Sequence, residues 1–201
     1  MSPLGDPLFG AMAALRTALL EVGEPHMLIG GTAVILRGVA RVTDDIDATV
    51  WAEHLDVEHL LAVLARHEIV GRIPDAAAFA HERQVLLLRH TPTATPMEVS
   101  LASLPFEREA LRRAELLDVS GMDMPVARAQ DLVIYKTIAW RDRDRTDVER
   151  LLHAYPDDID LAHVRRVIQE FAAALDEPER VEDFERLLAR VRGKPRRSPR
   201  G

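Results

Sequence analysis

The stretch IGGTAVILRGVARVTDDIDATV, residues 29–50, decides the fold of this chain. Gly30 and Gly31 carry no Cβ atom, so their backbone amides can approach an anion closely. The apolar residues that follow predict a short helix over residues 32–37, whose free N–H groups and positive dipole end would face that anion. This half of the stretch therefore predicts a cradle for phosphate.

The second half of the stretch predicts a strand that carries two carboxylates. Asp45 and Asp47 are two positions apart, so in a strand both side chains leave the same face. Two neighbouring carboxylates repel each other, and a cation between them relieves that repulsion. Mg²⁺ and Mn²⁺ prefer carboxylate oxygens, so the pair predicts a divalent metal site. A phosphate cradle beside such a site suits a nucleoside triphosphate.

A glycine pair, a short helix and an Asp-x-Asp strand, in this order, resemble the nucleotidyltransferase superfamily. The strings GGTAVILRG and RVTDDID are most similar to its AbiEii/AbiGii toxin-like branch. The resemblance covers residues 27–152 and implies a mixed-sheet α/β nucleotidyltransferase core followed by a C-terminal helical bundle. It also implies an enzyme that uses Mg²⁺ or Mn²⁺ to move a nucleoside monophosphate from a triphosphate such as ATP to an acceptor hydroxyl.

The acceptor is left open by the resemblance. A toxin of a toxin–antitoxin system, acting on RNA or protein and paired with a cognate antitoxin protein, is the first interpretation. An antibiotic adenylyltransferase and a non-catalytic nucleotide-binding partner module are the alternatives. Arg141, Arg143 and Arg145 would help to hold an RNA acceptor, unless they pair with the aspartates between them.

Composition restricts the other classes. The 201 residues include 47% hydrophobic residues, which can build a substantial core, and the net charge of −7 argues against a protein that coats nucleic acid. The absence of cysteine excludes disulfides, thiolate metal sites and a cysteine nucleophile. The histidines show no zinc-ligand spacing. No apolar run reaches the roughly 18 residues that span a bilayer, so we expect a cytoplasmic protein with no membrane partner.

Hydrophobic periodicity predicts how the chain is organised. We expect an α/β core over residues 1–128, a helical region over 129–192 that completes the site, and a disordered basic tail over 193–201. The expected strands are residues 26–29, 46–51, 83–89 and 96–101, with a hairpin of 116–119 and 124–126. The expected helices are residues 7–22, 32–37, 57–67, 129–140, 144–153, 160–174 and 179–192.

Two further residues are candidates near the aspartates. Glu98 alternates with Met97 and Val99, so it projects away from the core-facing side chains of its strand and could be a third metal ligand. The family usually has Asp at this place, and the alternative is an exposed strand glutamate. Thr43 could bind phosphate through its hydroxyl, or could bond to the local backbone.

The stretch DLVIYKTIAWRDRDRTDVERLL, residues 131–152, supplies the last candidates. Lys136 lies on an apolar helix face, where an ammonium group needs an anion. Asp147 lies about three helical turns further on, and the two residues approach each other if the helix breaks near Arg141. The resemblance implies that Lys136 contacts phosphate and that Asp147 assists the acceptor. The alternative is a solvated, salt-bridged helix face.

Overall fold

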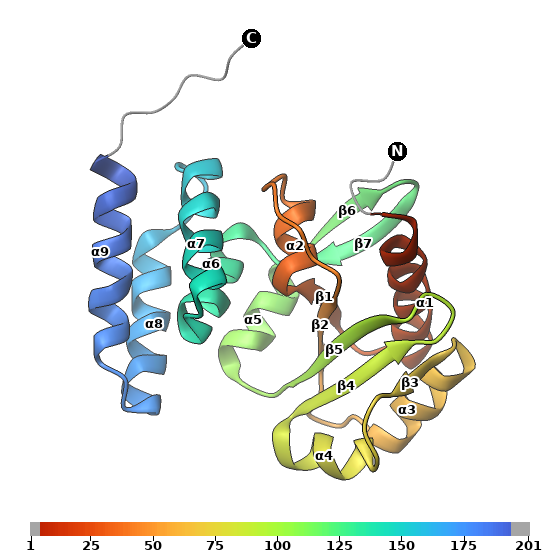
Figure 1. Ribbon diagram of the computed structural model, residues 1–201. Helices are drawn as coiled ribbons and strands as arrows, with labels where there is room; N and C mark the ends of the chain where they lie inside the picture. Colours follow the sequence, from red (N-terminus) through yellow and green to blue (C-terminus); the bar gives the residue numbers. More distant parts are fainter. Residues whose placement is uncertain (1–4, 194–201) are drawn as a thin grey trace. The chain divides into compact units, whose positions relative to one another are not determined.

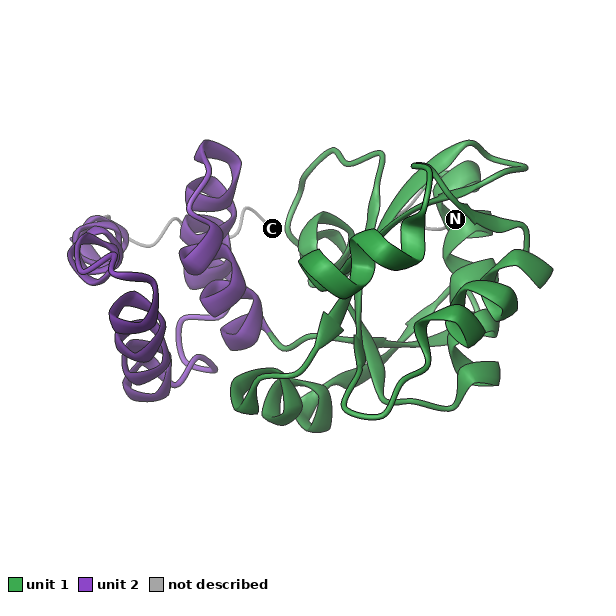
Figure 2. Ribbon diagram, turned by 90° about the horizontal axis from the view of Figure 1, so that it is seen from below, with its two compact units in different colours: residues 1–128 green, residues 129–201 purple. Residues whose placement is uncertain are grey.

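The protein consists of two compact units, residues 1–128 and 129–201 (Figure 1 and Figure 2). The structure is a computed structural model that describes residues 5–193. The expected basic tail, residues 193–201, therefore lies outside the described residues except for Gly193. No helix within the described part of the chain has the length and apolar character to cross a membrane.

Unit 1 is built on a mixed sheet, which in the described residues has seven strands in the order β3-β4-β5-β2-β1-β7-β6 (Figure 1). β2 pairs in parallel with β5, and β1 pairs in parallel with β7, whereas the other neighbours are antiparallel. The strands are β1 (His26–Ile29), β2 (Ile46–Trp51), β3 (Ile69–Gly71), β4 (Val85–His90), β5 (Thr95–Ala102), β6 (Glu115–Val119) and β7 (Met122–Val126). The predicted mixed α/β fold is confirmed.

Helices α1 (Asp6–Val22), α2 (Gly30–Leu36), α3 (Val57–Arg66), α4 (Ala76–Arg83) and α5 (Pro105–Arg113) accompany this sheet. Their ends follow local chemistry. The Asp56 carboxylate accepts the His59 N–H at the start of α3, and α1 ends at Gly23, whose φ of 82° is left-handed.

The two faces of the sheet differ because side chains alternate along each strand. In β2, Ile46, Ala48 and Val50 are completely buried. Helix α1 contacts β2 and β5 and so covers this apolar face, and α3 packs beside α1. Asp47 and Glu98 occupy the other face and are half-buried and exposed, respectively. The carboxylates therefore lie on the face that the apolar core does not need.

The sequence analysis misses three elements of unit 1, and several predicted boundaries differ from the structure; the strand expected from residue 83, for example, begins at Val85, because residue 83 still belongs to α4. β3 is too short to show alternation, and α4 is rich in alanine, so its apolar periodicity is weak. Helix α5 is short and highly charged, although it buries Phe106, Ala110 and Leu111 on one face. The helix expected over residues 32–37 begins at Gly30 instead. The two glycines are thus the first turn of α2 rather than the turn before it.

In the described residues of unit 2, helices are the regular elements, joined by short connections. Its helices are α6 (Ala129–Ala139), α7 (Asp142–Ala154), α8 (Leu161–Leu175) and α9 (Glu179–Gly193). Each amphipathic helix buries one apolar stripe, with Leu151 of α7, Ile168 of α8 and Phe184 of α9 among the buried side chains. Trp140 adopts a left-handed φ of 47°, which ends α6. The next residue, Arg141, is the N-cap of α7.

Candidate active site

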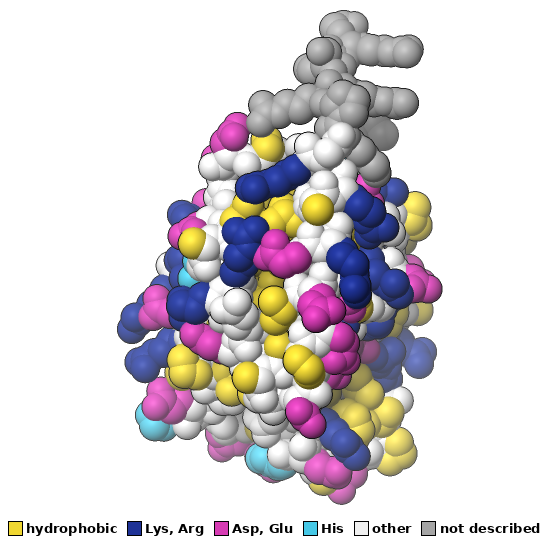
Figure 3. Space-filling model, turned by 90° about the vertical axis from the view of Figure 1, so that its left-hand side faces the viewer, with side chains coloured by type: hydrophobic (Ala, Val, Ile, Leu, Met, Phe, Trp, Pro, Cys, Tyr) yellow, Lys and Arg dark blue, Asp and Glu magenta, His cyan; other side chains and the backbone are white. Residues whose placement is uncertain are grey.

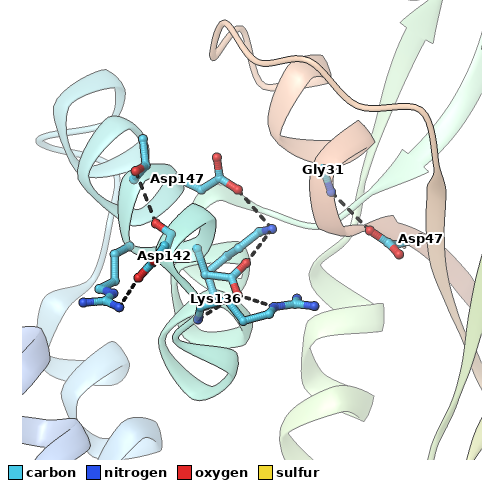
Figure 4. A network of polar contacts seen from close by, with 9 residues as sticks. Gly31, Asp47, Lys136, Asp142 and Asp147 are labelled. Carbon is cyan, nitrogen blue, oxygen red and sulfur yellow. Dashed lines mark hydrogen bonds and ion pairs between the residues drawn. The ribbon is translucent and has the colours of Figure 1, made fainter.

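The first turn of α2 interlocks with Asp47 of β2. The Gly31 N–H donates to Asp47 Oδ2 at 3.3 Å (Figure 4). Gly30 has a left-handed φ of 63°, and a Cβ atom placed on it would lie only 1.8 Å from Asp47 Oδ2. No side chain fits at Gly30 while Asp47 keeps this position. The glycine pair and Asp47, which the sequence analysis linked by their spacing, are therefore in direct contact in the fold.

Gly31 leaves space for two polar side chains from the loop before β2. A Cβ atom on Gly31 would lie 2.7 Å from Thr43 Oγ1 and 2.8 Å from Arg41 Cζ. Arg41 thus places its guanidinium on the glycine pair, a role that the sequence analysis did not assign to it. Its position between the glycines and the aspartates was the signal. A guanidinium here adds positive charge to the predicted phosphate cradle.

Asp45 lies at the end of this loop, directly before β2. Its Oδ1 accepts a hydrogen bond from Thr43 Oγ1 at 2.5 Å, and its backbone carbonyl accepts one from Thr32 Oγ1 at 2.8 Å. The Thr43 hydroxyl donates to a carboxylate, so a phosphate contact by the same hydroxyl stays a prediction. Together these bonds tie the loop, and with it Asp45, to helix α2.

Gly30→Ala is expected to destabilise the protein more than Gly38→Ala at the other end of α2. Both glycines are left-handed, with φ of 63° and 78°, so alanine costs about 1–2 kcal/mol at either position. Nothing lies within 4 Å of a Cβ on Gly38, whereas Gly30 faces Asp47. The clash should add about 1–3 kcal/mol, measured by urea unfolding. Equal losses would mean that Asp47 can move aside easily.

Glu98 is the neighbour of Asp47 across the β2–β5 pairing. Met97 and Val99 are buried and Glu98 is exposed, so Glu98 projects from the strand as predicted. Its Oε1 accepts a hydrogen bond from Arg72 Nη2 at 2.7 Å. The carboxylate is therefore engaged by a guanidinium that the sequence analysis missed, since nothing in the sequence marks Arg72.

The oxygen donors of unit 1 fit a hard divalent cation. Asp45 and Asp47 supply carboxylate oxygens from alternate positions of one chain segment, which is the chemistry that Mg²⁺ prefers. Among residues 5–193, no three His, Asp or Glu side chains are grouped so that they could hold a metal ion. The metal-ligand roles of Asp45, Asp47 and Glu98 therefore stay predictions.

Unit 2 contains a buried charge cluster around Lys136. Its ammonium nitrogen lies 3.1 Å from Asp144 Oδ1 and 3.1 Å from Asp147 Oδ2 (Figure 4). The three side chains are 6%, 0% and 3% exposed, respectively. The break between α6 and α7 brings Lys136 and Asp147 together, as the sequence analysis considered for a break near Arg141. The phosphate contact of Lys136 and the acceptor role of Asp147 stay predictions.

Asp144 joins this cluster to the beginning of α7. Its Oδ2 accepts from the backbone N–H and the Nε of Arg141, at 3.1 Å and 2.7 Å. Burial alone would raise the pKa of the Asp144 carboxyl, but the Arg141 hydrogen bond and the Lys136 charge outweigh burial, and the pKa lies below its usual value. The stabilisation from this carboxylate is therefore present at neutral pH and is lost as the pH falls through the folded-state pKa.

The other basic side chains of unit 2 alternate with acidic ones, and several of them form ion pairs. Arg145 pairs with Asp142, and Arg165 of α8 makes a bidentate contact with Glu185 of α9. The face that Figure 3 shows has blue basic and magenta acidic side chains mixed with apolar ones. Two of the three arginines expected to hold RNA, Arg141 and Arg145, thus have aspartate partners.

Comparisons with known proteins give a family match and several similar structures. Residues 8–193 match a family described as nucleotidyltransferase of unknown function (DUF6036). No curated protein matches the chain. An antigenic nucleotidyltransferase-like protein from Paracoccidioides brasiliensis has a similar structure, with 14% identity, 88% of this chain and 92% of that chain covered, and a TM-score of 0.52.

Two further solved structures have TM-scores below 0.5. JHP933 from Helicobacter pylori shares 15% identity over 94% of this chain and 92% of that chain, with a TM-score of 0.49. MenT4, a nucleotidyltransferase toxin from Mycobacterium tuberculosis, shares 18% identity over 72% of this chain and 55% of that chain, with a TM-score of 0.44.

The family match confirms the superfamily that the glycine pair and the Asp-x-Asp strand predicted, and with it the enzyme class. The similarity to the Paracoccidioides protein shows a shared fold. Because the family match extends over residues 8–193, the chain belongs to the DUF6036 family of nucleotidyltransferases.

Proposed function

We propose that this enzyme is a metal-dependent nucleotidyltransferase that moves a nucleoside monophosphate from a triphosphate to an acceptor hydroxyl. The contact between the first turn of α2 and Asp47 carries the proposal. It sets a helix N-terminus, suited to phosphate, directly against the Asp47 carboxylate, suited to a cation, with the Gly31 N–H donating to that carboxylate. A metal–triphosphate complex is the ligand that needs both kinds of group side by side.

Asp45 and Asp47 would hold the metal ion in this proposal. A bound Mg²⁺ would neutralise part of the negative charge of the triphosphate and would lower the pKa of the acceptor hydroxyl. The Gly30–Gly31 turn and the Arg41 guanidinium bind phosphate oxygens, and Thr43 orients Asp45 through its hydrogen bond. The acceptor oxygen then bonds to the α-phosphorus, the bond from that phosphorus to the pyrophosphate oxygen breaks, and the hydroxyl proton passes to water.

For the acceptor we propose RNA, with the protein acting as a toxin that a cognate antitoxin neutralises. The exposed Arg190 and Arg192 in the last turn of α9 support this choice, because basic side chains bind a phosphate backbone. The aspartate partners of Arg141 and Arg145 weaken it. Protein and aminoglycoside acceptors are therefore the other arms of the test.

The test of the proposed reaction has two parts. Mg²⁺ and a triphosphate together are expected to stabilise the folded protein by about 2.7 kcal/mol at 100 times the dissociation constant, measured by thermal unfolding with ATP, GTP, CTP and UTP in turn. Triphosphate labelled at the α-phosphate is then offered with total RNA, extract protein or aminoglycosides. Label should enter RNA. No stabilisation by any triphosphate at millimolar concentration would contradict the proposal.

A further inference from the structure

Strand register lines up one row of residues across the open face of the sheet. Ile29 of β1 pairs with Asp47, Asp47 pairs with Glu98, and Glu98 pairs with Leu87 of β4. Arg72 continues the row beyond β4, because its N–H donates to the Leu87 carbonyl at 2.9 Å. Paired residues project to the same face of a sheet. The row thus runs from a guanidinium through two carboxylates to the residue before the glycine pair.

Arg72 reaches over β4 to meet Glu98. Two strand spacings separate their backbones, roughly 10 Å, and the side chains close that distance with a contact of 2.7 Å between Nη2 and Oε1. A guanidinium has five N–H donors, and one N–H of Nη2 donates to Glu98. The N–H groups on Nη1 can therefore donate to an oxygen of a ligand. Its backbone is held by the pairing to β4, so the side chain starts from a rigid position.

Fold stability does not explain this ion pair. The Arg72 and Glu98 side chains are 29% and 49% exposed, and a pair so exposed contributes about 0–1 kcal/mol. Glu98 also lies directly beside Asp47, where two like charges on paired positions are unfavourable. The arrangement instead places a cation next to the carboxylates without using the buried core.

We propose that Arg72 binds the phosphate groups of the nucleoside triphosphate and that Glu98 is its positioning residue rather than a metal ligand. This inference rests on the proposed nucleotidyl transfer. Arginine binds phosphate through two parallel N–H···O contacts, so holding one Nη group on Glu98 fixes the plane in which the others point. Glutamate is one methylene longer than aspartate, and here that length lets the Glu98 carboxylate meet Arg72.

Four variants test the assignment: Arg72→Met, Glu98→Gln, their double mutant, and Arg66→Met as a matched control. Arg66 also pairs with a glutamate, Glu21, and joins α3 to α1 on the opposite side of the sheet, although its side chain is more exposed than that of Arg72, at 54% against 29%. Two quantities are measured by calorimetry and electron paramagnetic resonance. The first is the affinity for each triphosphate with Mg²⁺, and the second is the affinity for Mn²⁺ without nucleotide.

Arg72→Met and Glu98→Gln should each weaken triphosphate binding about tenfold, or about 1.4 kcal/mol. The double mutant should be no weaker than Arg72→Met, because the two residues act as a unit. Mn²⁺ binding should be unchanged in all four variants. The inference is overturned if Glu98→Gln weakens Mn²⁺ binding or if Arg72→Met binds triphosphate like the wild type. Wild-type protein that binds no triphosphate would instead overturn the proposed function itself.

Discussion

Asp47→Asn is expected to reduce nucleotidyl transfer by at least about 10³-fold while leaving the protein folded. Removing a metal-site carboxylate removes several kcal/mol of charge stabilisation in the transition state, and about 4 kcal/mol corresponds to that factor. Asparagine keeps the shape of the side chain, and its carbonyl oxygen can still accept the Gly31 N–H. Transfer of α-phosphate label to the RNA, protein and aminoglycoside pools measures the effect.

Asp44→Asn is the matched control for this substitution. This substitution makes the same charge change three positions earlier, in the loop before β2, where the Asp44 side chain is exposed and lies outside the proposed site. Its activity should stay within about threefold of the wild type, since exposed positions away from such features change energies by at most about 0.5 kcal/mol. If Asp47→Asn retains the activity of the Asp44→Asn control, Asp47 does not hold the metal and the proposed site is wrong.

Lys136→Met is expected to lower the free energy of unfolding of unit 2 by about 3–5 kcal/mol. Methionine fits the apolar part of the lysine site, but the Asp144 and Asp147 carboxylates would remain buried without the ammonium group between them. Breaking a buried ion pair on one side costs more than the pair itself contributes, because the remaining charge keeps its desolvation penalty.

Trp140 provides the readout, since it lies between α6 and α7 and is one of two tryptophans in the chain. In a Trp51→Phe background, its fluorescence during urea unfolding follows unit 2. Arg165→Met is the control, because its pair with Glu185 is 37% and 42% exposed and should contribute about 0–1 kcal/mol. A Lys136→Met variant that keeps its stability but loses triphosphate binding would favour the phosphate contact predicted from the sequence.

The sequence predicted those parts of the candidate site whose residues lie close together along the chain. The glycine pair, the two aspartates and the strand that follows them lie within residues 29–50, and their chemistry is visible in the order of the residues. Alternation also placed Glu98 on the exposed face of β5. Arg41 was within the same stretch, but its contact with Gly31 depends on how the loop turns back over α2.

By itself, the sequence determined the mixed α/β first half and the helical second half, because glycine permissiveness, side-chain alternation and helical periodicity are local properties. The superfamily followed from the resemblance of the glycine pair and the Asp-x-Asp strand to known nucleotidyltransferases. Only the tertiary structure decided which charges meet. Arg72 and Glu98 are 26 positions apart in the sequence. They meet because both lie next to Leu87 of β4, one on each side of that strand. Lys136 is enclosed by two aspartates because the chain reverses at Trp140. Such pairings depend on strand order and helix breaks, which no local pattern records.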